Sequence, residues 1–184
     1  LTPSAADPEA PAASKAVQLA RRLSRYTGRS RLVIVPYTHF DLHLMGSRNG
    51  YEALLFRRFA FRCGEAVARR LGAAALITGD SLSQVASQTL ENLISVDAAV
   101  SLPVLRPLVG LNKVSIMKRA EAIGTWKISA VPAKDCCALI ASSPRTRSEP
   151  GRLAEVEKHL FADPAEIVRL SLLESVIGVF EGGE

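Results

Sequence analysis

Two adjacent cysteines are the residues of this 184-residue chain best suited to covalent chemistry. Cys136 and Cys137 follow Lys134 and Asp135 in a stretch without strong periodicity. A thiol attacks as its thiolate, which the ammonium of Lys134 would favour and the carboxylate of Asp135 would oppose. Neighbouring cysteines can form only a strained disulfide, so no bridge between them is expected at rest. On these residues alone, the pair is either a nucleophilic site or two small buried side chains.

A second group of residues with chemical potential lies between residues 73 and 92. The apolar run 73–77 predicts a short buried strand that Gly79 interrupts, and Ser81 with Gln84 fits a capping box that begins a helix. The inward-facing residues expected of that helix are Val85, Leu90, Leu93 and Ile94. A strand that turns into a helix N-terminus presents free N–H groups to an anion. The same pattern also fits an ordinary strand-to-helix turn with a good cap.

A long amphipathic helix is predicted between Tyr51 and Leu71. Its apolar face is expected to contain Leu55, Phe59, Cys63 and Val67, so that Cys63 is a core residue. Its basic stripe consists of Arg58, Arg62 and Arg69, with Arg57 to one side. A polar loop at 142–149 adds Arg145 and Arg147. The candidates for contacts with RNA phosphates are Arg58, Arg62, Arg69, Arg145 and Arg147. The alternative is that these residues form a solvated basic surface.

The charge of the chain is unevenly distributed. Residues 1–148 carry 20 Lys and Arg against 10 Asp and Glu, whereas residues 149–184 carry 3 against 8. A basic body suits a nucleic-acid partner, although a solvated surface explains it equally well. No apolar run reaches the length of about 20 residues that spans a membrane, and no signal peptide is evident. Three cysteines without a CxxC pair predict neither a disulfide framework nor a metal knuckle, and favour a cytoplasmic protein.

The remaining elements alternate between helices and strands. Strands are predicted at 31–36 and 104–108, and helices at 15–26, 112–123, 150–161 and 164–180. Ser14, Asn112 and Asp163 are the expected N-caps. Residues 1–13 are rich in proline and alanine and are expected to form a flexible arm. His39 and His43 would suit a metal if helical, but no third ligand is evident, so 38–50 is predicted to be a polar surface loop.

The run TGDSLSQVASQTLENL, together with LRPL at 105–108 and Asp135-Cys136-Cys137, resembles the tRNA 4-thiouridine synthetases, or tRNA uracil 4-sulfurtransferases. The resemblance extends from about Ser14 to the C-terminus. It implies that 14–184 is the C-terminal part of an ATP-pyrophosphatase-type α/β domain, with a doubly wound, mostly parallel sheet and helices on both faces. The first strands and the SGG-x-DS loop of that domain would precede residue 1. The strand at 31–36 would then lack its neighbours, and the chain is not expected to form this fold stably alone.

The resemblance also implies an activity. Family members adenylate the uracil carbonyl oxygen of a tRNA uridine with ATP and replace it with persulfide sulfur. Position by position, Arg57, Gly79 and Gln88 match residues that bind the nucleotide, and Cys137 matches the cysteine that handles sulfur in members that use one. The implied ligands and partners are ATP, Mg²⁺, tRNA, a persulfide donor such as a cysteine desulfurase, and a second copy of the chain.

Two other functions fit the same residues. The chain could be a binding module for RNA or protein that lacks the ATP loop, or a related ATP-pyrophosphatase in thiazole formation for thiamine. The SGG-x-DS sequence upstream of Leu1 would separate the enzyme from the binding module. An RNA-free sulfur-transfer assay would test the thiazole function.

Overall fold

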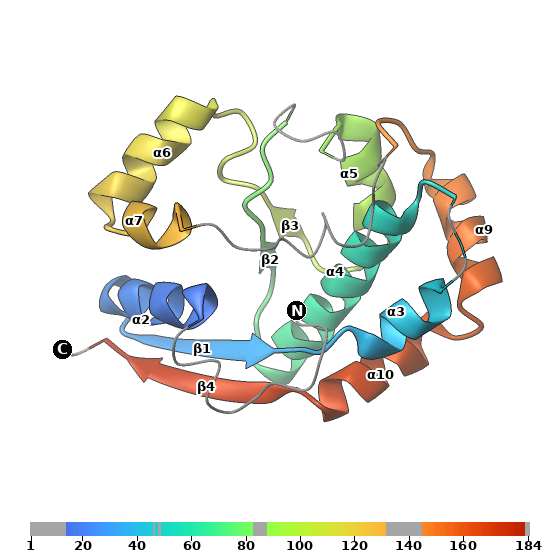
Figure 1. Ribbon diagram of the computed structural model, residues 1–184, viewed down its shortest axis with the longest axis horizontal. Helices are drawn as coiled ribbons and strands as arrows, with labels where there is room; N and C mark the ends of the chain where they lie inside the picture. Colours follow the sequence, from blue (N-terminus) through green and yellow to red (C-terminus); the bar gives the residue numbers. More distant parts are fainter. Residues whose placement is uncertain (1–13, 46, 48, 83–87, 132–144, 183–184) are drawn as a thin grey trace.

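The computed structural model describes residues 14–45, 47, 49–82, 88–131 and 145–182 of the chain and shows an α/β fold (Figure 1). In the described residues, two small sheets are surrounded by helices. β1 (Arg29–Ile34) pairs with β4 (Val176–Glu181) in antiparallel register, and β2 (Leu76–Ile77) pairs with β3 (Val104–Leu105) in parallel. The predicted α/β class is confirmed, and the β2–β3 pair is its parallel part.

The core forms around the long helix α4 (Glu52–Arg70), which crosses the middle of the molecule in Figure 1. Helices α3 (Thr38–Leu44), α9 (Pro150–Leu160) and α10 (Pro164–Leu173) pack against it. Phe40 stacks on Phe59 of α4, with ring centroids 5.1 Å apart. Cys63 is only 3% exposed, which confirms its prediction as a core residue. Burial raises the pKa of its thiol to about 12, so this cysteine is unreactive.

Local capping signals in the sequence set the ends of several helices. Ser14 accepts a hydrogen bond from the Val17 N–H at the start of α2 (Lys15–Thr27), and Asn112 caps α6 (Lys113–Ala122) in the same way. Asp163 accepts from two backbone N–H groups at the start of α10. Gly124 follows α6 with a φ of 71°, a conformation that favours glycine, and the short helix α7 (Trp126–Ser129) comes next. These predicted caps are confirmed.

The C-terminal segment differs from its prediction. The helix expected to reach residue 180 ends at Leu173, and Val176–Glu181 forms β4. This segment is rich in β-branched residues, and the free edge of β1 supplies backbone partners along its whole length. The expectation that the strand near 31–36 lacks neighbours was therefore wrong, because the C-terminal segment provides one.

The helix after Gly79 also starts elsewhere. The predicted start at Ser81 was wrong, because α5 (Leu90–Asp97) begins nine residues later and is capped by Thr89, whose hydroxyl accepts from the Asn92 N–H. Among the predicted inward residues, Leu93 is buried, but Leu90 and Ile94 are exposed. Val85 and Gln84 lie outside the described residues. The helix that contains Leu93 therefore does not begin directly after Gly79, and residues 83–87 lie outside the described residues.

The segment predicted as a polar surface loop contains helix α3. His39 Nε2 lies 2.9 Å from Glu174 Oε1, and His43 Nδ1 lies 2.7 Å from the His39 carbonyl oxygen. The two histidines therefore have partners within the protein rather than a shared ligand. Within the described ranges there is no group of three metal-ligating side chains, and no helix is long and apolar enough to cross a bilayer.

Candidate functional site at the ends of β2 and β3

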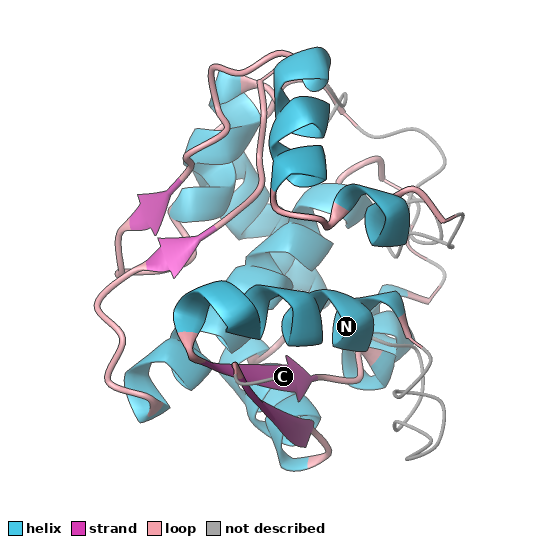
Figure 2. Cartoon of the chain, turned by 90° about the vertical axis from the view of Figure 1, so that its left-hand side faces the viewer, coloured by secondary structure: helices cyan, strands magenta, loops and turns pink. Residues whose placement is uncertain are grey.

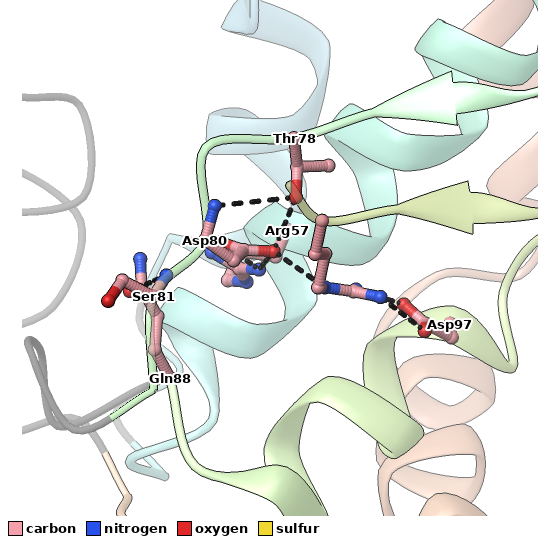
Figure 3. Close-up of polar contacts among 7 residues, drawn as sticks. Arg57, Thr78, Asp80, Ser81, Gln88 and Asp97 are labelled. Carbon is pink, nitrogen blue, oxygen red and sulfur yellow. Dashed lines mark hydrogen bonds and ion pairs between the residues drawn. The ribbon is translucent and has the colours of Figure 1, made fainter. Parts of the chain in front are cut away.

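The parallel pairing of β2 with β3 creates a polar edge. Leu76 pairs with Val104 and Ile77 with Leu105, so the chain leaves both strands at the same edge of the sheet. In α/β folds, ligands bind outside the carboxyl ends of parallel strands. Thr78 and Asp80 follow β2 there (Figure 3). Arg106 directly follows β3.

Asp80 is the centre of this edge. Arg57, which projects from α4, donates from Nη2 to both Asp80 carboxylate oxygens at 2.9 Å. The Thr78 hydroxyl and Arg106 Nε donate to the same carboxylate at 2.8 and 3.1 Å. Burial of Asp80 disfavours its charged form, but the positive charge of Arg57 and these hydrogen bonds outweigh it and hold the Asp80 pKa below its usual value. Asp80 is therefore ionised at neutral pH and fixes both guanidinium groups.

Arg106 connects the edge to helix α5. Its Nη1 donates to Asp97 Oδ2 at 2.8 Å, and its Nη2 donates to the other oxygen of Asp97. Burial opposes its charge, but the hydrogen bonds and charges of Asp97 and Asp80 raise the Arg106 pKa above its usual value. The ring of Phe61 lies 5.7 Å from the Arg57 guanidinium and 6.0 Å from that of Arg106. Two permanently charged groups are thus positioned side by side in a nearly rigid frame.

The backbone beside this cluster is open. A Cβ atom placed on Gly79 would meet no atom within 4 Å in the described part of the chain. Ser81 donates its N–H to Gln88 Oε1 at 3.1 Å and its hydroxyl to the Leu111 carbonyl at 2.9 Å. Gln88 therefore lies at the same edge as Gly79 and Arg57. It precedes α5, so it is not part of that helix. Figure 3 shows Arg57 and Gln88 on either side of Asp80 and Ser81, and Gly79 directly precedes Asp80 in the chain. The three predicted nucleotide-binding positions therefore share one neighbourhood.

The polar edge at Asp80 suits a nucleotide better than it suits a metal. Three features suit an anionic ligand with phosphates. The space at Gly79 is free, and two guanidinium groups lie next to each other. The buried Arg57 Nε–H also has no partner among the described atoms. A metal fits less well, because Asp80 and Asp97 are both paired with arginine. The described residues thus provide no carboxylate set for Mg²⁺.

The other predicted site residues are scattered. Arg58 is buried and donates to Glu157 at 2.8 Å and to the Ser95 carbonyl at 2.7 Å, while Arg62 donates to the same Glu157 oxygen at 2.8 Å. Burial opposes the charge of Glu157, but hydrogen bonds from Arg58 and Arg62 and their charges lower its pKa. Arg58 and Arg62 thus tie α4 to α5 and α9. They do not form a surface stripe, which corrects that part of the expectation.

Arg69, Arg145 and Arg147 remain closer to the surface. Arg69 is exposed and pairs with Glu65 one turn earlier at 2.9 Å. Arg145 lies over the ring of Tyr51 at 4.5 Å, and Arg147 is 82% exposed with a distant Glu91 at 3.9 Å. Cys136 and Cys137 lie outside the described residues.

Asp80, Thr78 and Arg106 were not among the predicted site residues. A signal was present for Thr78 and Asp80, which closely follow the apolar run 73–77, whereas Arg106 lay inside the strand predicted at 104–108 and follows β3 only in the structure. Strands that are parallel neighbours place such residues together. The pairing of β2 with β3 was the missing information.

The fold and the site define a class: an α/β protein with an arginine-rich candidate site outside the carboxyl ends of parallel strands. The chain belongs to the ThiI family, because the family model described as "Thiamine biosynthesis protein (ThiI)" matches residues 4–161. The resemblance inferred from the motifs is thereby confirmed.

Individual relatives agree with the family. The chain is 44% identical over 162 residues to the "Probable tRNA sulfurtransferase" of Thermus thermophilus, covering 87% of this chain and 39% of the relative. It is 46% identical over 153 residues to that of Nocardia farcinica, covering 81% and 37%. It also matches the "Crystal structure of a 4-thiouridine synthetase - RNA complex with bound ATP" with a TM-score of 0.83 and 35% identity, over 91% of this chain and 44% of that one. The chain thus spans about two fifths of the length of these proteins.

Proposed function

We propose that this chain is part of an ATP-dependent tRNA sulfurtransferase that converts uridine to 4-thiouridine. The observation that carries the proposal is the similarity, at 35% identity and a TM-score of 0.83, to a 4-thiouridine synthetase with RNA and bound ATP. The polar edge at Asp80 supports it, because it offers fixed positive charge and open backbone where a nucleotide could bind.

The difficulty of the reaction is that the uracil carbonyl oxygen is a poor leaving group. Transfer of AMP from ATP to this oxygen, with release of pyrophosphate, would make it a good one. The outer sulfur of the persulfide would then attack the ring carbon, and AMP would depart with the oxygen. A second thiol would attack the inner sulfur, so that the outer sulfur stays on the base and the two thiols form a disulfide, which an external thiol reductant would reopen. Arg57 would place charge near the nucleotide, Gly79 would allow it to approach the backbone, and Gln88 would offer a hydrogen bond. Asp80 would orient Arg57 without touching the substrate.

Cys137 is the proposed sulfur-handling residue. Cys63 cannot take this role, because it lies in the core with a pKa of about 12. The sulfur donor would be a persulfide-carrying partner such as a cysteine desulfurase, and Mg²⁺ would accompany the phosphates of ATP. We further propose that the protein is cytoplasmic and forms a homodimer.

A Gly79→Val variant tests the nucleotide site. The added side chain would occupy the space in which the nucleotide approaches the backbone, so ATP affinity measured by calorimetry on the intact protein should fall at least tenfold. Gly151→Val is the matched control, because Gly151 also faces open space but lies on α9, away from the site. Equal ATP affinity in Gly79→Val and the native protein would contradict the assignment.

Cysteine variants test the sulfur step. Cys137→Ser should abolish formation of thiolated tRNA while ATP binding persists, and Cys136→Ser should have a small or intermediate effect. Cys63→Ser should cost stability but leave sulfur transfer unchanged, because its side chain is buried away from solvent. The measurement is the yield of 4-thiouridine per enzyme in the intact protein. Full activity of Cys137→Ser would contradict the role of Cys137 in sulfur transfer and would mean that the two adjacent cysteines only contribute to packing.

A second function is favoured by the family description, which names thiamine biosynthesis. The same adenylation and sulfur chemistry would serve a sulfur-transfer step toward the thiazole ring. Sulfur transfer measured without RNA, in the native protein and in Cys137→Ser, would test it. Activity that persists only when tRNA is present would exclude this second function.

A further inference from the structure

The positive charge of the chain is concentrated on three helices. Helices α2, α6 and α7, here called the basic lobe, contain eight Lys and Arg residues and one acid, Glu121. Their net charge of +7 exceeds the +5 of the whole chain. Helix α7 contacts both α2 and α6. The three helices lie together on the left of Figure 1, the side that faces the viewer in Figure 2.

Two of the eight cations hold the lobe together. Lys15 Nζ donates to the Ser129 carbonyl at 3.0 Å, at the end of α7, and Arg22 Nε donates to the Ile123 carbonyl at 3.0 Å, at the end of α6. Both cations lie at helix C-termini, where the negative end of the helix dipole stabilises a positive charge. The arrangement fixes α2 against the C-terminal ends of both other helices.

The other six cations are exposed and have no ion pair with any described residue. They are Arg21, Arg25, Lys113, Lys118, Arg119 and Lys127. Elsewhere in the described ranges, arginines are commonly engaged: Arg57 and Arg106 with Asp80, Arg58 and Arg62 with Glu157, and Arg169 with Glu166. A surface with this excess of unpaired cations has a strongly positive potential and attracts polyanions.

The lobe is attached to the candidate site. Ser81 donates its hydroxyl to the Leu111 carbonyl at 2.9 Å, and the Leu82 N–H donates to the Val109 carbonyl at 3.1 Å. Asn112, the next residue after Leu111, caps α6. The loop that carries Gly79 and Asp80 is therefore hydrogen-bonded to the segment that begins the lobe.

We propose that the basic lobe binds the phosphate backbone of the RNA substrate next to the site of chemistry. This inference rests on the proposed function, since it assigns a surface to the RNA of that reaction. A uridine that enters the site carries phosphates on both sides, and these would lie over α6 and α2. Contacts to phosphates position an RNA without reading its bases, which suits cations on flexible side chains. The lobe replaces the stripe of Arg58 and Arg62, whose charges are used inside the protein.

The test compares two variants that each remove four exposed cations from the intact protein. The lobe variant is R21Q/R25Q/K118Q/R119Q, and the control is R70Q/R152Q/K158Q/R169Q, which removes the same charge from α4, α9 and α10. The probe is an unmodified tRNA transcript, and its affinity is measured at several salt concentrations. Each phosphate contact contributes about one unit to the salt slope, so the lobe variant should lose about two to four units and the control less than one.

The readouts separate this proposal from the proposed function. A lobe variant with the native salt slope, or an equal loss in both variants, overturns the lobe as the RNA surface while tRNA thiolation by the native protein upholds the function. A native protein that binds no tRNA overturns both. Single variants R21Q and K118Q should each lower the slope by about one unit, which keeps the test decisive if the fourfold variant is unstable. ATP affinity should be unchanged in all of them.

Discussion

Two neighbouring arginines of α4 enter two different ion-pair clusters. Arg57 reaches Asp80 at the ends of β2 and β3, and Arg58 reaches Glu157 between α4, α5 and α9. Successive residues of a helix differ by about 100° in direction, so adjacent side chains point to different sides of it. The Arg57 side chain is 13% exposed and the Arg58 side chain 4%. The two clusters are chemically alike, and their surroundings give them different roles.

The difference between the clusters lies in what surrounds them. The Glu157 cluster is enclosed by helices, and its arginines otherwise donate to the carbonyls of Ser95 and Ala99. The Asp80 cluster lies at a strand edge beside Gly79, where the backbone is open. We therefore assign stability to the Glu157 cluster and ligand binding to the Asp80 cluster, and the following variants test that division.

The largest effect on stability is expected for Glu157→Ala. This change leaves Arg58 buried without its carboxylate partner, and breaking a buried pair in this way costs about 3–5 kcal/mol. The free energy of unfolding, measured with urea on the intact protein, should fall accordingly. Glu155→Ala is the control, because Glu155 is exposed on the same helix and its one ion pair within the described ranges is with the exposed Arg152. Its cost should therefore stay below about 1 kcal/mol. A Glu157→Ala protein of native stability would contradict the structural role.

The next largest effect is expected for Asp80→Asn, and it should appear in activity. The change keeps the side-chain volume but removes the charge that holds Arg57 and Arg106. A misplacement of such groups costs on the order of 100-fold in rate, so kcat/KM for tRNA thiolation should fall by about that factor. Asp97→Asn is the matched control, since among the described residues Asp97 pairs with Arg106 alone, and its change should cost less. A large loss of stability with normal activity in Asp80→Asn would reverse the assignment.

Lysine substitutions of the two adjacent arginines should sharpen the contrast. Lysine keeps the charge but cannot reproduce the two-pronged contacts of a guanidinium. Arg58→Lys should lower the free energy of unfolding by about 1–2 kcal/mol, because a buried acceptor loses its partner. Arg57→Lys should change stability less and weaken ATP binding instead. Denaturant titration and calorimetry on both variants check this, and identical profiles for the two would remove the distinction.

The smallest effect is a pH dependence of stability. The folded-state pKa of Glu157 is lowered, so its contribution is present above the unfolded-state pKa of about 4.3 and is lost as the pH falls through the folded-state value. The stability of the native protein should therefore decline more steeply below about pH 4 than that of Glu157→Gln. Thermal unfolding at pH 3 to 7 measures the difference. Parallel curves for the two proteins would contradict the lowered pKa.

The candidate site was partly predictable. Motif resemblance was enough to select Arg57, Gly79 and Gln88, because each lies in or near a distinctive run of residues. Asp80 was accessible in principle, because it closely follows the apolar run 73–77, whereas Arg106 was predicted to lie within the strand 104–108, which ends at Leu105 in the structure. Their meeting required the parallel register of β2 and β3, which joins residues 26 positions apart.

What the sequence determined by itself were features set within one or two helical turns. Ser14, Asn112 and Asp163 reach backbone N–H groups two or three residues ahead, and helical periodicity placed Cys63 in the core. The tertiary structure alone decided that Arg58 is an interior residue, because its partner Glu157 lies 99 positions away. It likewise decided that Val176–Glu181 is a strand, since the edge of β1 was the unpaired neighbour available to it. A hydrogen bond between residues close in the chain can be predicted from their spacing in the sequence. The partner of a buried charge or of a strand edge can be far away in the sequence and is brought close only when the chain folds.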